Sequence, residues 1–130
     1  MSPSPSAQKL LFLLSVASPE NPALCVMPFV YAAVAAAMES EVEVHFTGYA
    51  VRLLVDGLAA GLGAGENDGK TVYDHMQEAA RQGARFSACS RALKQQIAAG
   101  EKMIAEYSGA AGAATVVMRS LDPDWRVLCF

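Results

Sequence analysis

The pattern that decides the fold is GARFSACSRALKQQI, residues 83–97. Its first part, 84–88, is a short apolar run typical of a buried strand, and the run ends at Cys89. From Ser90 to Ala99 the sequence predicts a helix. A side chain at such a junction lies at the carboxyl edge of an α/β sheet, where these folds bind their ligands. Cys89 is therefore the leading candidate for a functional residue.

Strand and helix patterns alternate along the rest of the chain. We expect a disordered Ser/Pro-rich lead at 1–8, followed by one domain at 9–130. Strands are predicted at 9–16, 42–47, 84–88, 102–106 and 126–130, helices at 22–39, 49–55, 71–82, 90–99 and 110–119, and a flexible Gly-rich connection at 57–69. This order predicts an α/β fold, a three-layer α/β/α sandwich around a mainly parallel five-stranded sheet.

Composition narrows the function classes. The 130 residues have a net charge of -3 without a basic block, so nothing predicts binding to nucleic acid or to an anionic membrane. The three cysteines, at positions 25, 89 and 129, match no zinc or CxxC spacing. We therefore expect reduced thiols in a cytoplasm, with no disulfide framework, metal or cofactor.

Two apolar stretches bear on localisation. Lys9 precedes the run Leu10 to Ala17 as in a signal peptide, but residues 2–6 add no second positive charge and the run is short. The uncharged stretch from Leu24 to Met38 is shorter than the roughly 20 residues that cross a bilayer. We expect a cytoplasmic protein whose apolar helix is covered by the sheet and by another subunit.

Several residues accompany Cys89 as candidates for the site. Amide groups in the first turn of the helix, beginning at Ser90, and the charge of Arg91 would favour a thiolate. The second strand ends at 47–49, so its last residues are expected to line the same edge: Thr47, Gly48 and Tyr49. Cys25 follows the first strand and is a candidate second, resolving thiol.

Each cysteine also has a structural interpretation. Free cysteine is among the residue types most often buried, so Cys89 and Cys25 are alternatively small core residues. Cys129, in an apolar strand, is expected in the core. If Cys89 is reactive, its thiolate attacks a sulfane sulfur or a disulfide, and a second thiol removes the terminal sulfur of the persulfide.

Two segments extend this interpretation, VEVHFTGYAVRLL at 42–54 and GARFSACSRAL at 83–93. Together with the order of elements, they resemble the DsrE/DsrF-like sulfur-relay family over residues 9–130. The resemblance implies a small α/β protein that forms trimers or hexamers, exchanges sulfur with donor and acceptor proteins, and holds sulfur as a persulfide on a cysteine after a central strand. Cys89 occupies that position.

Two further functions stay open. A protein of this fold also serves as a non-catalytic interaction subunit if its thiols are inert. The segment AGENDGKT, residues 64–71, fits a phosphate-binding loop if Ala64 replaces the first glycine, with Lys70 and Thr71 as phosphate and magnesium ligands. His45 is a candidate for a titrating or ligand-binding residue. Because it shares one face of the second strand with Glu43, we interpret the two as marking a sheet edge or a subunit contact.

Overall fold

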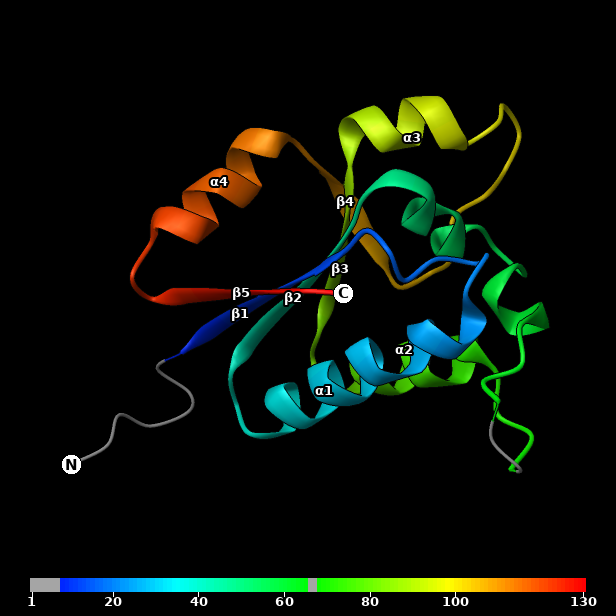
Figure 1. The fold of residues 1–130 in the computed structure, drawn as a ribbon, viewed down its shortest axis with the longest axis horizontal. Coiled ribbons are helices and arrows are strands. Elements are labelled where there is room, and N and C mark those ends of the chain that lie inside the picture. Colours follow the sequence, from blue (N-terminus) through cyan, green and yellow to red (C-terminus); the bar gives the residue numbers. More distant parts are fainter. Residues whose placement is uncertain (1–7, 66–67) are drawn as a thin grey trace.

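A computed structural model of the protein describes residues 8–65 and 68–130. Its centre is a five-stranded sheet in the order β4-β3-β2-β1-β5, in which every neighbouring pair is parallel (Figure 1). The strands are β1 (Lys9–Leu14), β2 (Glu41–Phe46), β3 (Arg85–Cys89), β4 (Tyr107–Ala111) and β5 (Trp125–Cys129). The predicted α/β fold with a five-stranded parallel sheet is confirmed.

Helices cover both faces of this sheet. They are α1 (Val26–Ala37), α2 (Val72–Gln82), α3 (Ser90–Gln96) and α4 (Ala113–Leu121). Figure 1 shows α1 and α2 together on one face and α4 on the other, with α3 at the edge where β3 ends. A 3-10 helix, η3 (Gly48–Leu54), follows β2 and packs against α3. Shorter 3-10 turns occupy Pro22–Cys25 and Ala59–Gly61.

The main core lies between the sheet and the helix pair α1 and α2. Phe29 of α1, Phe46 of β2 and Phe86 of β3 are completely buried, with ring centroids 5.5 to 5.9 Å apart. Aromatic pairs at these separations stabilise a fold beyond the area they bury. This packing fixes which face of β2 and β3 points inward, and the alternate residues then point toward α4.

The helix boundaries follow local signals. Thr71 caps α2 by accepting a hydrogen bond from the Asp74 amide, and the Asp74 carboxylate accepts one from the Thr71 amide, which completes a capping box. Gly83 ends α2 with φ of 117°, a conformation that L side chains rarely adopt. The predicted helix at 71–82 therefore agrees with α2.

The prediction of a strand at 102–106 is wrong. Met103 instead forms an isolated antiparallel bridge with Val55, and the Ile104 amide donates to the Leu54 carbonyl. These contacts attach the segment to the end of η3, and β4 begins only at Tyr107. The following helix consequently begins at Ala113 rather than near residue 110.

Two predictions of environment are also wrong. Glu43 and His45 do not mark an edge, because β2 is the central strand and the two side chains are buried. Cys129 is exposed rather than in the core, because β5 is an edge strand on the outside of the sheet.

The predicted lead at 1–8 falls almost entirely outside the described residues. In the part of the chain that the structure describes, no helix has the length and hydrophobicity needed to cross a bilayer.

Candidate functional site at the end of strand β3

Cys89 is the last residue of β3 and the N-cap of α3. Its side chain is half-buried and lines a cavity of about 220 Å³ at the carboxyl edge of the sheet, beneath α4. The other lining residues come from the ends of β1 and β2 and from α4: Leu13, His45, Thr47, Ala113, Val116 and Val117. Most of this wall is apolar, and its polar groups are the thiol, an imidazole and a hydroxyl.

Strand register explains why these residues meet. His45 of β2 pairs with Ser87 of β3, and Leu13 of β1 pairs with His45. Because side chains alternate along a strand, residues two positions further on face the same side. Thr47 and Cys89 are those residues, so they extend the His45 and Ser87 pair to the end of the sheet.

The surroundings of Cys89 lower the pKa of its thiol below the ordinary value. Burial by itself raises that pKa, but the amides of Ala92 and Arg91, the Thr47 hydroxyl and the Arg91 charge together outweigh it. A hydrogen bond from any of these donors favours the anionic sulfur over the uncharged thiol. Since α3 has only seven residues, individual amides matter here rather than a long helix dipole.

A buried polar chain lies next to the cavity on the same face of the sheet. The Ser87 hydroxyl donates to Glu43 Oε2 at 3.0 Å, and His45 Nδ1 lies 2.9 Å from Ser87 Oγ. Arg119 of α4 reaches Glu43 Oε1 at 3.4 Å, and its guanidinium lies 4.2 Å from the centre of the Trp125 ring. These contacts attach α4 to the sheet beside the cavity.

Comparison with known proteins identifies the family of the domain. The sequence model of the DsrE/DsrF-like family matches residues 8–130, which is nearly the entire chain. This chain belongs to the DsrE/DsrF-like family. No curated protein matches it.

Two solved structures support the fold of this DsrE/DsrF-like protein. The ychN protein from E. coli superposes with a TM-score of 0.72 at 13% identity, covering 95% of this chain and 99% of that one. A protein of unknown function from Methanobacterium thermoautotrophicum, MTH1491, gives a TM-score of 0.66 at 18% identity, covering 95% of this chain and 99% of that one. At these identities the likeness concerns the fold alone.

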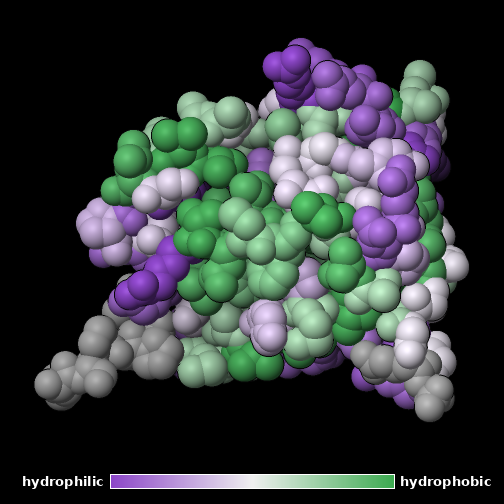
Figure 2. Space-filling model, viewed as in Figure 1, coloured by the Kyte–Doolittle hydropathy of each residue, from purple (hydrophilic) through white to green (hydrophobic). Residues whose placement is uncertain are grey.

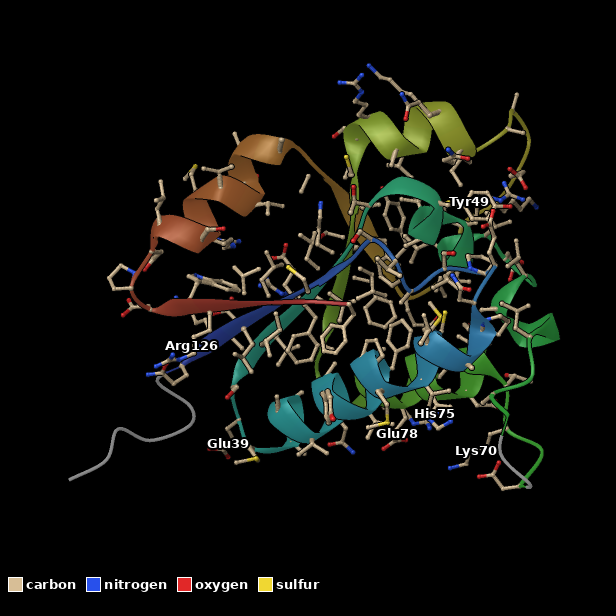
Figure 3. The ribbon with its side chains drawn as sticks, viewed as in Figure 1. Glu39, Tyr49, Lys70, His75, Glu78 and Arg126 are labelled. Atoms are coloured by element: carbon tan, nitrogen blue, oxygen red, sulfur yellow. The ribbon has the colours of Figure 1, made fainter. Side chains whose placement is uncertain are left out.

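The other predicted site residues of this DsrE/DsrF-like chain divide into two groups. Thr47 lines the cavity with Cys89, and Arg91 acts on the thiol through its amide and its charge. Ser90 begins α3 without lining the cavity, and Gly48 begins η3 with φ of 56°. Tyr49 contributes to the environment of Arg52 and lies on the outer side of η3 (Figure 3), so it does not line the cavity either.

Cys25 has the opposite environment from Cys89. It is completely buried, and its thiol donates to the carbonyl oxygens of Ser18 and Asn21 at 3.2 and 3.6 Å. Burial raises its pKa to about 11, which keeps it protonated at neutral pH. These contacts favour a structural role for Cys25 over that of a resolving thiol.

Sequence reasoning did not assign His45 to the site, although the alternation of Glu43, His45 and Thr47 placed them on one face of a strand. The missing information was the register with β3, which brings Ser87 and Cys89 beside them. The α4 side chains, Val116 and Val117, had no detectable signal, because an apolar residue on a helix is usually interpreted as core.

The predicted phosphate loop is built differently from a nucleotide site. It follows the 3-10 turn Ala59–Gly61 rather than a strand, and the Thr71 hydroxyl caps α2. Glu66 and Asn67 lie outside the described residues. A shallow groove of about 350 Å³ between α1 and α2 includes His75 and Glu78 of α2 and Lys70 of the preceding loop, all labelled in Figure 3. No cysteine lines that groove and no strand ends there, so Cys89 remains the centre of the candidate site.

Proposed function

We propose that this protein is a small intracellular sulfur carrier of the sulfurtransferase type, which takes sulfane sulfur onto Cys89 as a persulfide and passes it to a partner. The observation that carries the proposal is the combination at Cys89 of a lowered thiol pKa, partial exposure and an adjoining cavity. Cys25 lacks exposure and has a raised pKa. The family assignment supports the same chemistry.

The proposed transfer needs few groups. The Cys89 thiolate attacks the outer sulfur of a donor persulfide, a new sulfur–sulfur bond forms, and the donor leaves as a thiol after taking up a proton. An acceptor thiolate later attacks the terminal sulfur on Cys89 and regenerates the thiol. The cavity wall beside the persulfide is mostly apolar, with Leu13, Val116 and Val117.

We also propose that the protein works as a homo-oligomer, a trimer or a hexamer. Met27, Tyr31 and Val34 form one stripe along α1, with 45%, 50% and 54% of their surfaces exposed. Figure 2 shows hydrophobic surface continuing from α1 across β5 to α4, where Leu128, Val117, Met118 and Leu121 are exposed. Covering large apolar side chains of this kind is the usual driving force for subunit association.

A discharge experiment tests the carrier function. The protein is loaded with glutathione persulfide, separated from the donor by gel filtration and then mixed with excess glutathione. We expect the extra sulfur to leave Cys89 and to appear as trapped glutathione persulfide, with the Cys129→Ser variant behaving like the wild type. Sulfur that stays on the protein, or equal discharge from Cys89→Ser, contradicts a carrier role.

The exposed α1 stripe also favours a second function, that of a non-catalytic interaction subunit. In that case the thiols are inert and the apolar surface binds a partner. Thiol reactivity separates the two, since an inert Cys89 reacts with iodoacetamide no faster than exposed Cys129.

A further inference from the structure

Three polar side chains on the central strands form a continuous chain that ends at the Cys89 cavity. Glu43 Oε2 accepts a hydrogen bond from the Ser87 hydroxyl at 3.0 Å, and Ser87 Oγ lies 2.9 Å from His45 Nδ1. Only 7% of the surface of Glu43 and 2% of that of His45 are exposed. Buried polar side chains are usually hydrogen-bonded, and because the Ser87 hydroxyl donates to Glu43, the direction of the contact with His45 can be assigned.

The assignment fixes the tautomer of His45. Glu43 lies between Arg119 and Arg85, with its Oε1 at 3.4 and 3.7 Å from their guanidinium groups, so its carboxylate accepts hydrogen bonds. Ser87 has one proton, and it donates that proton to Glu43. Its oxygen must then accept from His45, which places the ring proton on Nδ1 and the lone pair on Nε2.

His45 also lines the cavity that contains the Cys89 thiol. The remaining polar group in that wall is the Thr47 hydroxyl, and the rest of the lining is aliphatic. A neutral imidazole with its Nε2 lone pair therefore shares a small, mostly apolar space with the thiol. This arrangement suits proton transfer between a ring nitrogen and a sulfur, because the imidazole and the thiol line one cavity with a single other polar group, the Thr47 hydroxyl.

We infer that His45 is the acid–base residue of sulfur transfer at Cys89, with Ser87 and Glu43 as positioning residues that hold its tautomer. The inference rests on the proposed carrier function. In the uptake step, His45 Nε2 takes the Cys89 proton, and the resulting thiolate attacks the outer sulfur of an alkyl persulfide. The bond between Cys89 and that sulfur forms as the sulfur–sulfur bond of the donor breaks. The imidazolium then gives its proton to the departing thiolate, so the products are the Cys89 persulfide and a free thiol.

The charges around His45 agree with this role. Burial lowers the pKa of the imidazole, whereas the Glu43 charge raises it, and the net direction is downward. The ring is consequently neutral and able to accept a proton at pH 7. The titratable and charged groups near it are Glu43 on its own strand, Arg85 and Cys89 on β3 and Arg119 on α4, while its partner on β1 is the apolar Leu13.

Two probes that differ in their leaving group test the inference. Glutathione persulfide expels an alkyl thiolate, which needs a proton, whereas Ellman's disulfide expels an aromatic thiolate that is stable without one. The lowered pKa of Cys89 lets its thiol lose its proton to solvent as well at pH 8, so we expect His45→Gln to react with Ellman's disulfide within about twofold of the wild type. Its sulfur uptake from glutathione persulfide should fall by roughly tenfold or more, the usual range for loss of an acid–base group.

Ser87→Ala provides a second, milder variant that keeps the imidazole. We expect a smaller loss of sulfur uptake from glutathione persulfide and no change with Ellman's disulfide. ¹⁵N NMR of the neutral imidazole should show the proton on Nδ1 in the wild type and a mixture of the Nδ1–H and Nε2–H tautomers in the variant. Equal slowing with both probes, or an Nε2–H tautomer in the wild type, overturns the role of His45. If wild-type protein takes up no sulfur at all, the carrier function itself fails, and the tautomer measurement still reports on the polar chain.

Discussion

His45 and Ser87 are 42 residues apart in the chain and pair directly across β2 and β3, with Nδ1 2.9 Å from Oγ. This pair connects the two halves of the candidate site, because β2 continues to Thr47 and β3 to Cys89. A parallel register therefore sets the position of an imidazole, a hydroxyl and a thiol around one cavity. The chemistry of the site depends on the sheet rather than on any contiguous motif.

Thr47 should tune the reactivity of Cys89. Its hydroxyl is one of the groups that lower the pKa of the thiol. Thr47→Val keeps the shape and removes that donor, so the pKa of Cys89 should rise and its rate of alkylation by iodoacetamide at pH 7 should fall by roughly three- to tenfold. Exposed Cys129, followed in the same digest, is the internal control. A change of similar size at both cysteines would point to a general structural effect instead.

Cys25 should make folding stability depend on pH in the alkaline range. Its pKa is raised from 9.0 to about 11 by burial, so its contribution is fully present below pH 9 and is lost as the pH rises toward 11. The loss at the upper end should approach about 2–3 kcal/mol in the free energy of unfolding. Urea unfolding at pH 7 and pH 10.5 measures it.

The comparison is between the wild type and Cys25→Ala, because other groups titrate in both proteins. Cys25→Ala should be less stable at pH 7 and should lose less stability between the two pH values. Cys129→Ser, which removes an exposed thiol, serves as the matched variant and should keep the wild-type pH dependence. Parallel pH profiles for wild type and Cys25→Ala would show that the thiol is not buried as described.

Arg119 should attach α4 to the sheet. It reaches the nearly buried Glu43 and stacks on Trp125, and none of the residues of α4 is itself buried. Arg119→Met should destabilise the fold by about 1–3 kcal/mol, because it leaves the Glu43 carboxylate less compensated and removes the cation–π contact. Hydrogen exchange should rise in α4 and stay unchanged in α2. Arg126→Met, on the exposed part of β5, is the control, and equal effects of the two substitutions would rule out this role of Arg119.

The apolar stripe on α1 should hold the subunits together. Met27→Glu and Tyr31→Glu place a charge on side chains that are half exposed in the isolated chain. Light scattering coupled to size exclusion should give an oligomer for the wild type and a folded monomer for the double variant. Lys94→Glu, at an exposed position of α3, should leave the mass of the oligomer unchanged. A wild-type monomer at micromolar concentration excludes the proposed assembly.

The sequence predicted the fold well where the pattern was local. The apolar run before Cys89 and the helix after it correspond to β3 and α3, and the Thr71 to Gly83 segment has the cap and terminator of α2. Predictions were wrong where tertiary contacts decided the outcome. Residues 102–106 have apolar character suited to a strand, but Met103 bridges to Val55 and the sheet continues only from Tyr107.

The candidate site was predictable only in part for the same reason. Cys89 and Thr47 could be placed at strand ends from their own surroundings. His45 looked like a residue of an edge strand, because a buried polar pair on a central strand cannot be recognised without its partners, Ser87 and Arg119. Cys129 looked like a core residue, because the sequence of β5 does not reveal that the strand lies at the edge.

Intact mass spectrometry tests the central claim, persulfide formation on Cys89, most directly. Reduced protein is incubated with a sulfane-sulfur donor, and the wild type, Cys89→Ser and Cys129→Ser are measured side by side. We predict an addition of about 32 Da to the wild type and to Cys129→Ser, and none to Cys89→Ser, because the persulfide adds one sulfur atom to one thiol. Equal labelling of Cys89→Ser and the wild type, or no labelling of any of the three proteins, would contradict the assignment.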